Sequence, residues 1–114
     1  MASKDNVATE KVLEKTLSDK LNKVPGIWCI KLSAQFITGI PDRMVICRGG
    51  YVAFVEVKGT GLKPRRSQEV IHDKIRALGF DMFVLDNPEQ RDKMIEYFKS
   101  KVKPIEPITK VMSL

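Results

Sequence analysis

Side chains that bind transition metals are scarce in this 114-residue sequence. It contains one histidine and two cysteines, so no tetrahedral zinc site of cysteine and histidine ligands can be assembled. Cys29 and Cys47 both lie in apolar segments that read as strands. We therefore expect both to be small buried side chains rather than ligands.

Long hydrophobic runs are also missing. No run approaches the roughly 20 apolar residues of a membrane span, and the first residues lack the apolar stretch of a signal peptide. The G-x-x-x-x-G-K-[ST] motif of nucleotide-binding phosphate loops is absent as well. With 43% hydrophobic and 30% charged residues, we expect one soluble, cytoplasmic domain over residues 1–114, with no membrane contact and no small-molecule cofactor.

The charge is unbalanced. Twenty basic residues against fourteen acidic ones give a formal net charge of +6. This favours a polyanion as partner, and nucleic acid is the commonest polyanion. A basic protein that has no such partner is an equal alternative on charge alone.

Hydrophobic periodicity and turn residues divide the chain into seven elements. They predict helices at 7–23, 67–78 and 89–101 and strands at 27–32, 43–48, 51–58 and 80–85. The core is expected at about 7–101, and residues 102–114 form a tail that Pro104 and Pro107 keep extended. The inward side chains of the third helix are predicted to be Met94, Ile95 and Phe98.

The second predicted helix has a clear beginning and end. Ser67 is the expected N-cap, and Gly79 is the expected C-terminal stop. Its inward stripe is predicted to consist of Ile71, Ile75 and Leu78. His72 is expected at the surface or its boundary, without a catalytic role.

Three charged residues, Asp42, Glu56 and Lys58, lie in the most apolar part of the chain. Charged groups are rarely buried unless they are paired or bind a metal ion. Residues two apart in a strand share a face, so Glu56 and Lys58 point the same way. A hairpin through the turn pair Gly49-Gly50 sets the Asp42 strand beside the Glu56 strand. The set predicts a divalent-metal site at the end of a sheet, and a buried salt-bridge cluster is the alternative.

Two strings carry a resemblance to a known family. Pro41-Asp42 followed by Glu56-Val57-Lys58 resembles the signature of PD-(D/E)xK nucleases. The longer strings Gly-Ile-Pro-Asp-Arg and Phe-Val-Glu-Val-Lys, followed by Gln68 at a helix start, resemble the VRR-NUC branch of that superfamily. The match runs from about Glu10 to about Leu85.

The resemblance implies an α/β fold with a restriction-endonuclease-like core. Its elements follow the order α-β-β-β-α-β, with a four-stranded mixed sheet flanked by helices, and a further helix and the tail come after. Stand-alone members of this size are typical of phages and bacteria, so a phage or bacterial origin is implied.

The resemblance also implies a nuclease that depends on Mg²⁺ or Mn²⁺. Asp42 and Glu56 would bind the ion together with the backbone carbonyl of Val57, in keeping with the preference of Mg²⁺ for oxygen ligands. An acidic residue of the first helix is expected to assist. Glu10 matches the family pattern better, and Glu14, one turn away, is the second choice.

The roles of the remaining site residues are expected from their chemistry and position and, for Gln68, from the resemblance. Lys58 would hold the attacking water or stabilise charge that develops on the phosphate. Gln68 would orient that water or Lys58, and a surface glutamine near an N-cap is the alternative. Lys63, Arg65 and Arg66 adjoin a helix N-terminus and would grip a phosphate backbone without reading bases. A simple solvated charge run is the alternative for these three.

The expected function is therefore structure-selective hydrolysis of phosphodiester bonds in DNA, and the resemblance points to branched DNA such as Holliday junctions. The apolar residues after Pro104 and an exposed sheet edge favour a homodimer. For a phage protein, the compartment would be the host cytoplasm. The alternative is a non-catalytic or degenerate nucleic-acid-binding module.

Overall fold

The structure is a computed structural model that describes residues 6–105. Its elements are α1 (Glu10–Asn22), β1 (Ile27–Lys31), β2 (Arg43–Cys47), β3 (Tyr51–Val57), α2 (Arg66–Ala77), β4 (Asp81–Leu85) and α3 (Pro88–Lys101). The predicted number, type and order of elements are confirmed. The part of the predicted tail after residue 105 lies outside the described residues. No described helix is both long and apolar enough to pass through a lipid bilayer.

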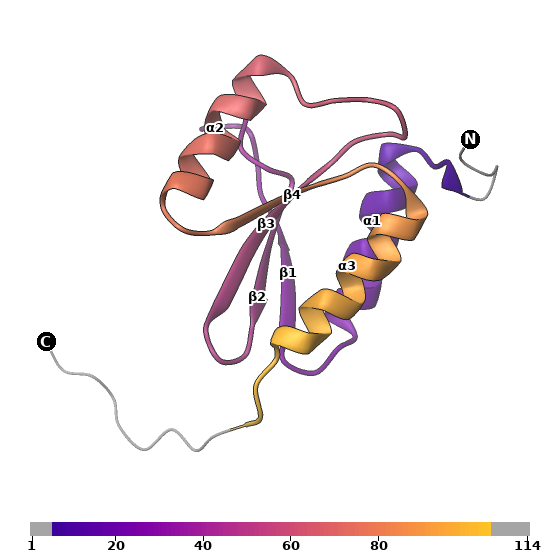
Figure 1. Ribbon diagram of the computed structural model, residues 1–114, viewed down its shortest axis with the longest axis vertical. Helices are drawn as coiled ribbons and strands as arrows, with labels where there is room; N and C mark the ends of the chain where they lie inside the picture. The colour runs from indigo at the N-terminus through magenta and orange to yellow at the C-terminus, as the bar shows by residue number, and fades with distance from the viewer. Residues whose placement is uncertain (1–5, 106–114) are drawn as a thin grey trace, which may run out of the picture.

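The four strands form one mixed sheet in the order β1-β2-β3-β4. β1, β2 and β3 pair in antiparallel fashion, whereas β4 runs parallel to β3. A parallel pair needs a crossover connection, and here α2 supplies it. The C-terminal ends of β3 and β4 and the N-terminal end of β2 therefore lie at the same end of the sheet (Figure 1).

The hydrophobic core lies between the sheet and the pair α1 and α3, which cover one face (Figure 1). The predicted inward residues of α3 are confirmed, since Met94, Ile95 and Phe98 are all buried. They meet buried leucines of α1 and the odd-numbered side chains of β2 and β3. Cys29 and Cys47 are buried in this core, as expected, and burial raises the pKa of both thiols.

Helix α2 lies on the other side of the sheet (Figure 1), and it differs from its prediction at two points. Its N-cap is Arg65 rather than Ser67, because the side chain of Gln68 accepts a hydrogen bond from the Arg65 N–H at 2.9 Å and fixes an earlier start. Leu78 is 69% exposed, and the buried residues of the helix are Gln68 and His72. The helix packs against β4, and its buried His72 lies near Glu56 at the end of β3, so its inner face carries polar side chains as well as the half-buried Ile71 and Ile75.

The β2–β3 hairpin also differs in detail. Three residues, Arg48 to Gly50, link the strands instead of the expected two. Both glycines have positive φ, +104° and +96°, and the Gly50 N–H donates to the Cys47 carbonyl at 3.1 Å. Positive φ is what glycine alone adopts freely. The resulting register sets Arg43 opposite Val55.

Candidate active site

Asp42 and Glu56 come together because of this register. Arg43 and Val55 form the last pair of the β2–β3 ladder. Asp42 comes immediately before Arg43 and Glu56 immediately after Val55, so the two lie at the same end of the ladder. The Val57 N–H donates to Asp42 Oδ2 at 2.8 Å, and the Leu32 N–H donates to the Asp42 carbonyl at 2.8 Å. The carboxylate is thereby fixed to the strand that carries Glu56, as the sequence predicted.

The residues just before Asp42 explain the string Gly-Ile-Pro-Asp. Gly39 is buried with φ +88°, and a Cβ atom there would lie 2.4 Å from the carbonyl oxygen of Ser67. Pro41 is fully buried and fixes φ immediately before the aspartate. The loop can therefore pass tightly under the start of α2 and deliver Asp42 to the sheet end only with glycine at position 39.

Glu56 is the most unusual group of the site. It is 1% exposed, and its Oε1 atom has no hydrogen-bond partner within residues 6–105. Burial is the main cause that raises its pKa to about 9; the neighbouring Asp42 carboxyl adds to the rise, and the Lys58 ammonium opposes it. The buried Glu56 carboxyl and the half-buried Asp42 carboxyl next to it thus lack sufficient compensating positive charge.

His72 is the neighbour of Glu56 that the sequence reasoning missed. It is 2% exposed, so its expected position at the surface is wrong. Its Nε2 atom lies 3.6 Å from Glu56 Oε1, too far for a hydrogen bond. Burial, with the Arg76 charge as a second cause, lowers the pKa of the imidazole, which favours the neutral ring. One signal was present: His72 lies one helical turn after Gln68 and shares its face.

Gln68 and Lys58, two further predicted site residues, lie in the first turn of α2 and directly after β3. Gln68 is buried, and its Oε1 atom accepts from the Arg65 N–H. The hydrogens on Nε2 are the donors that its amide group could offer to a ligand. Lys58 follows β3, where its N–H continues the ladder to the Leu85 carbonyl at 2.8 Å. Its positive charge lowers the pKa of both Glu56 and His72, so the ammonium group is electrostatically coupled to both side chains.

The two candidate glutamates of α1 have different surroundings. Glu14 Oε1 accepts from Lys31 Nζ at 2.7 Å and from Arg43 Nε at 3.1 Å. Glu10 is exposed in the first turn of the helix, and its charge raises the pKa of Glu56. Glu10 is therefore the acid of α1 that is electrostatically coupled to the site.

Thr60 links three segments near the site by hydrogen bonds. No sequence pattern had predicted this role. The Thr60 N–H donates to the Ala8 carbonyl at 3.1 Å, and its hydroxyl accepts from the Ala8 N–H at 3.0 Å. The hydroxyl also donates to the Asp86 carbonyl at 2.6 Å. The β3–α2 loop is thereby tied to the segment before Glu10 and to the end of β4.

The basic residues of the β3–α2 loop stand at the start of α2. Lys63, Arg65 and Arg66 are all exposed. Arg66 Nη1 lies 3.7 Å from Glu69 Oε2, and both side chains are largely in water, where such pairs contribute little. The positive charge of this loop is therefore available to a ligand.

The donor set fits a hard divalent cation. The described residues contain no group of three or more His, Cys, Asp and Glu side chains that could hold a metal ion. Mg²⁺, however, typically takes one or two carboxylates and completes its shell with water and substrate. Asp42, the unpartnered oxygen of Glu56 and the adjacent carbonyl of Val57 could bind it, and its charge would offset the pair of carboxylates.

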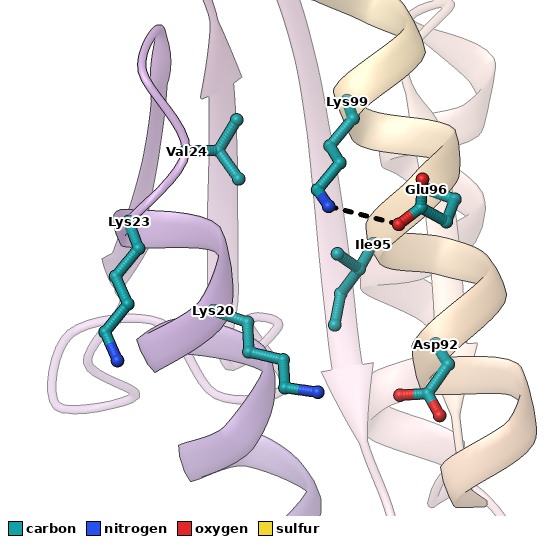
Figure 2. A pocket seen from close by; sticks show the side chains of 7 residues that line it. All are labelled: Lys20, Lys23, Val24, Asp92, Ile95, Glu96 and Lys99. Atoms are coloured by element: carbon teal, nitrogen blue, oxygen red, sulfur yellow. Dashed lines mark hydrogen bonds and ion pairs between the residues drawn. The ribbon is translucent and has the colours of Figure 1, made fainter.

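A separate hollow of about 360 Å³ lies between the end of α1 and the middle of α3 (Figure 2). It is lined by Lys20, Lys23, Val24, Asp92, Ile95, Glu96 and Lys99. Lys99 is bound to Glu96 of its own helix at 3.1 Å. The hollow adjoins the C-terminal end of α1, whereas Glu10 lies at the N-terminal end of that helix, so the hollow is separate from the candidate site.

Comparison with known proteins supports a single family. A protein named "Putative nuclease p44", from Acyrthosiphon pisum secondary endosymbiont phage 1, is 36% identical over 80 residues, which cover 70% of this chain and 85% of that protein. A solved structure described as a VRR_NUC domain has a TM-score of 0.70 and 32% identity, and the match covers 80% of this chain and 99% of that one. No protein-family model matches the chain. The fold and these two relatives together show that the chain belongs to the VRR-NUC family of nuclease domains.

Proposed function

We propose that this protein is a metal-dependent endonuclease that hydrolyses phosphodiester bonds in DNA and selects branched structures such as Holliday junctions. The observation that carries the proposal is the buried oxygen of Glu56, which has no partner within residues 6–105 and belongs to a carboxyl group whose pKa responds to the charges of Asp42 and Lys58. A binding module that used these groups only as a salt bridge would pair that oxygen. A metal site requires it to be free for a ligand.

The proposed roles follow from the contacts of each side chain. A bound Mg²⁺ or Mn²⁺ ion would polarise the phosphoryl oxygen and lower the pKa of the attacking water. Asp42, held by the Val57 N–H, and Glu56 would fix that ion. Lys58 would stabilise the negative charge that develops on the phosphate, and Nε2 of Gln68 would orient the water.

The substrate class follows from the basic residues beside the site. The exposed Lys63, Arg65 and Arg66 would hold phosphates beside the site and carry no sequence information themselves. Selection by DNA shape is therefore favoured over selection by sequence.

We also propose that the active form is a homodimer. A four-way junction has two-fold symmetry and is resolved only when two strands are cut. A two-fold dimer with isologous contacts presents two sites in matching geometry. The sheet face away from α1 and α3 supports this proposal, because it carries apolar side chains that no described helix covers along β1 and β2.

One experiment tests the function directly. Single-stranded, duplex, flap and four-way-junction DNA are incubated with the protein in Mg²⁺, Mn²⁺ or EDTA. Cleavage is expected with either metal, greatest for the branched DNA, and absent in EDTA. Asp42→Asn should abolish cleavage and leave the circular dichroism spectrum unchanged. Activity of that variant near the wild-type level in Mg²⁺ would show that the metal site is misplaced.

A further inference from the structure

Of the large apolar side chains in residues 6–105, that of Phe36 is the most exposed, at 87%. It lies in the loop between β1 and β2. A single exposed apolar residue is ordinary on a protein surface, so exposure alone assigns nothing. The position of the loop relative to the site is what gives Phe36 a role.

Three backbone contacts fix that position. The Leu32 N–H donates to the Asp42 carbonyl at 2.8 Å and closes the loop at its base. Further along, the Ile40 N–H donates to the Ile37 carbonyl at 3.4 Å, and Gly39 packs against the backbone of Ser67 in α2. The loop thus extends past the end of the sheet beside α2 (Figure 1). Its exposed part, which carries Phe36, is anchored on one side to Asp42 itself.

Positive charge gathers beside the same helix start. Arg65 and Arg66 immediately precede Ser67, the residue that Gly39 touches, and both are exposed. Leu62, on the same basic loop, is 60% exposed. Basic side chains that follow a phosphate backbone, together with an aromatic ring that meets base faces, are the combination by which proteins bind unpaired nucleic acid.

We infer that Phe36 stacks on an exposed base next to the phosphate that is cut, and that this contact makes cutting selective for DNA whose bases are unpaired or unstacked at a branch. The inference rests on the proposed nuclease function and adds the residue that recognises the substrate. Bases inside a continuous duplex have both faces covered by their neighbours. A ring on a fixed loop can reach a base face only where a base is unpaired or a step is opened.

A fluorescence experiment tests the contact without any cleavage. The chain has one tryptophan, Trp28, so the double variant Trp28→Phe/Phe36→Trp carries a single reporter on the loop. In EDTA, at DNA concentrations where anisotropy of labelled DNA shows saturation, flap DNA should quench this tryptophan more strongly than continuous duplex of the same length. Trp28→Phe/Leu78→Trp is the control, because Leu78 is also exposed, at 69%, but lies at the far end of α2. Equal quenching by both DNAs, or none, would overturn the inference.

Cleavage by variants of Phe36 gives the second test. Loss of one stacked base corresponds to about 5- to 150-fold, so Phe36→Ala and Phe36→Leu should cut flap DNA slower by a factor in that range. Their cutting of continuous duplex should not change, and Phe36→Trp should retain the flap activity. Unchanged cutting by Phe36→Ala on every DNA, with an active wild type, would overturn this inference alone. A wild type that cuts no DNA in Mg²⁺ or Mn²⁺ would instead overturn the proposed function.

Discussion

Glu56 Oε1 and His72 Nε2 lie 3.6 Å apart in the interior, and neither atom has a hydrogen-bond partner among residues 6–105. Buried polar atoms without partners are rare in folded proteins, and each one lowers stability. Burial also disfavours charge on both groups, because it raises the pKa of Glu56 and lowers the pKa of His72. The pair therefore weakens the metal-free fold at the place where the proposed ion would bind.

The first prediction is that Glu56→Gln stabilises the metal-free protein at neutral pH although it abolishes cleavage. The pKa of Glu56 is raised from an ordinary 4.5 to about 9, so the folded protein keeps a proton that the unfolded chain loses. The contribution of Glu56 to wild-type stability is then fully present below pH 4.5 and falls as the pH rises toward 9. Glutamine cannot ionise. The melting temperatures of the two proteins in EDTA should converge near pH 4 and separate increasingly up to pH 9.

Mg²⁺ provides the control for this prediction. A ligand that binds only the folded state raises the melting temperature, so Mg²⁺ should stabilise the wild type and leave Glu56→Gln unchanged. A difference in melting temperature that stays constant from pH 4 to pH 9 would contradict the assignment of the proton to Glu56.

The second prediction concerns His72 as a positioning residue for Glu56. In His72→Leu the carboxyl group loses its polar neighbour, and groups around a metal ligand typically affect affinity by about 10- to 100-fold. The Mg²⁺ concentration for half-maximal cleavage should rise by about that factor, while the rate at saturating Mg²⁺ changes much less. His72→Gln should restore part of the metal affinity. Asp73→Asn is the matched control, because Asp73 is the next residue of α2 and its side chain is 77% exposed; an equal effect there would refute the role of His72.

The sheet and the pair of carboxylates could be predicted because their signals are local. The strands are short apolar runs bounded by turn residues, and side-chain alternation fixes which residues share a face. Arg43 through Cys47 and Tyr51 through Val57 follow that rule. Even with a three-residue hairpin in place of the expected two, Asp42 still lies beside the strand of Glu56.

The inner face of α2 could not be predicted in this way. Hydrophobic periodicity assigns apolar side chains to the interior, and it selected Leu78, which is exposed, over His72, which is buried. The helix packs near the polar end of the sheet, and only the tertiary structure shows this. Glu10 and Glu14 also share one helix face, so their sequence spacing could not separate them. Arg43 and Lys31, brought by the sheet, separate them.

The third prediction uses that separation. Glu10→Gln should weaken cleavage and raise the Mg²⁺ requirement, because Glu10 is electrostatically coupled to Glu56. Glu14→Gln should leave the cleavage rate and the Mg²⁺ requirement nearly unchanged. It should lower the free energy of unfolding instead, since it removes the charged partner of the largely buried Arg43. A cost of about 1–3 kcal/mol is expected for such a loss. Metal titration of the rate and urea unfolding of both variants measure the two effects, and the opposite pattern would make Glu14 the functional acid.

The fourth prediction separates DNA binding from chemistry. Changing Lys63, Arg65 and Arg66 together to alanine should lower DNA affinity and flatten its dependence on salt, because each lost phosphate contact removes about one unit of slope. Lys58→Ala should instead lower the cleavage rate by about a hundredfold or more and leave the DNA affinity nearly unchanged. Fluorescence anisotropy over a range of NaCl concentrations measures the slope. If the triple variant keeps the wild-type slope, this loop does not grip the phosphates.

The fifth prediction is a homodimer whose interface is the open face of the sheet. On this face six apolar side chains are exposed or half-buried, namely those of Trp28, Ile30, Met44, Ile46, Val52 and Phe54. Trp28 is 63% exposed, and tryptophan is one of the residue types that are enriched at the centres of protein interfaces. Within the described part of the chain, α2 packs against β4 and leaves β1 and β2 open on this side. An apolar sheet face of this kind gains stability when a second copy covers it.

Sedimentation at micromolar concentration decides the matter. The expected mass is twice the 12.9 kDa of one chain. Trp28→Lys should shift the protein toward monomer, since a charge would be buried without a partner. Leu78→Lys, an equally drastic change at an exposed site of α2, should leave the mass unchanged. Removal of residues 104–114 tests the tail separately: a truncated protein that stays dimeric assigns the contact to the sheet face, and a monomeric one assigns it to the tail. A mass of one chain, with no more than one chain bound per junction, would exclude the dimer.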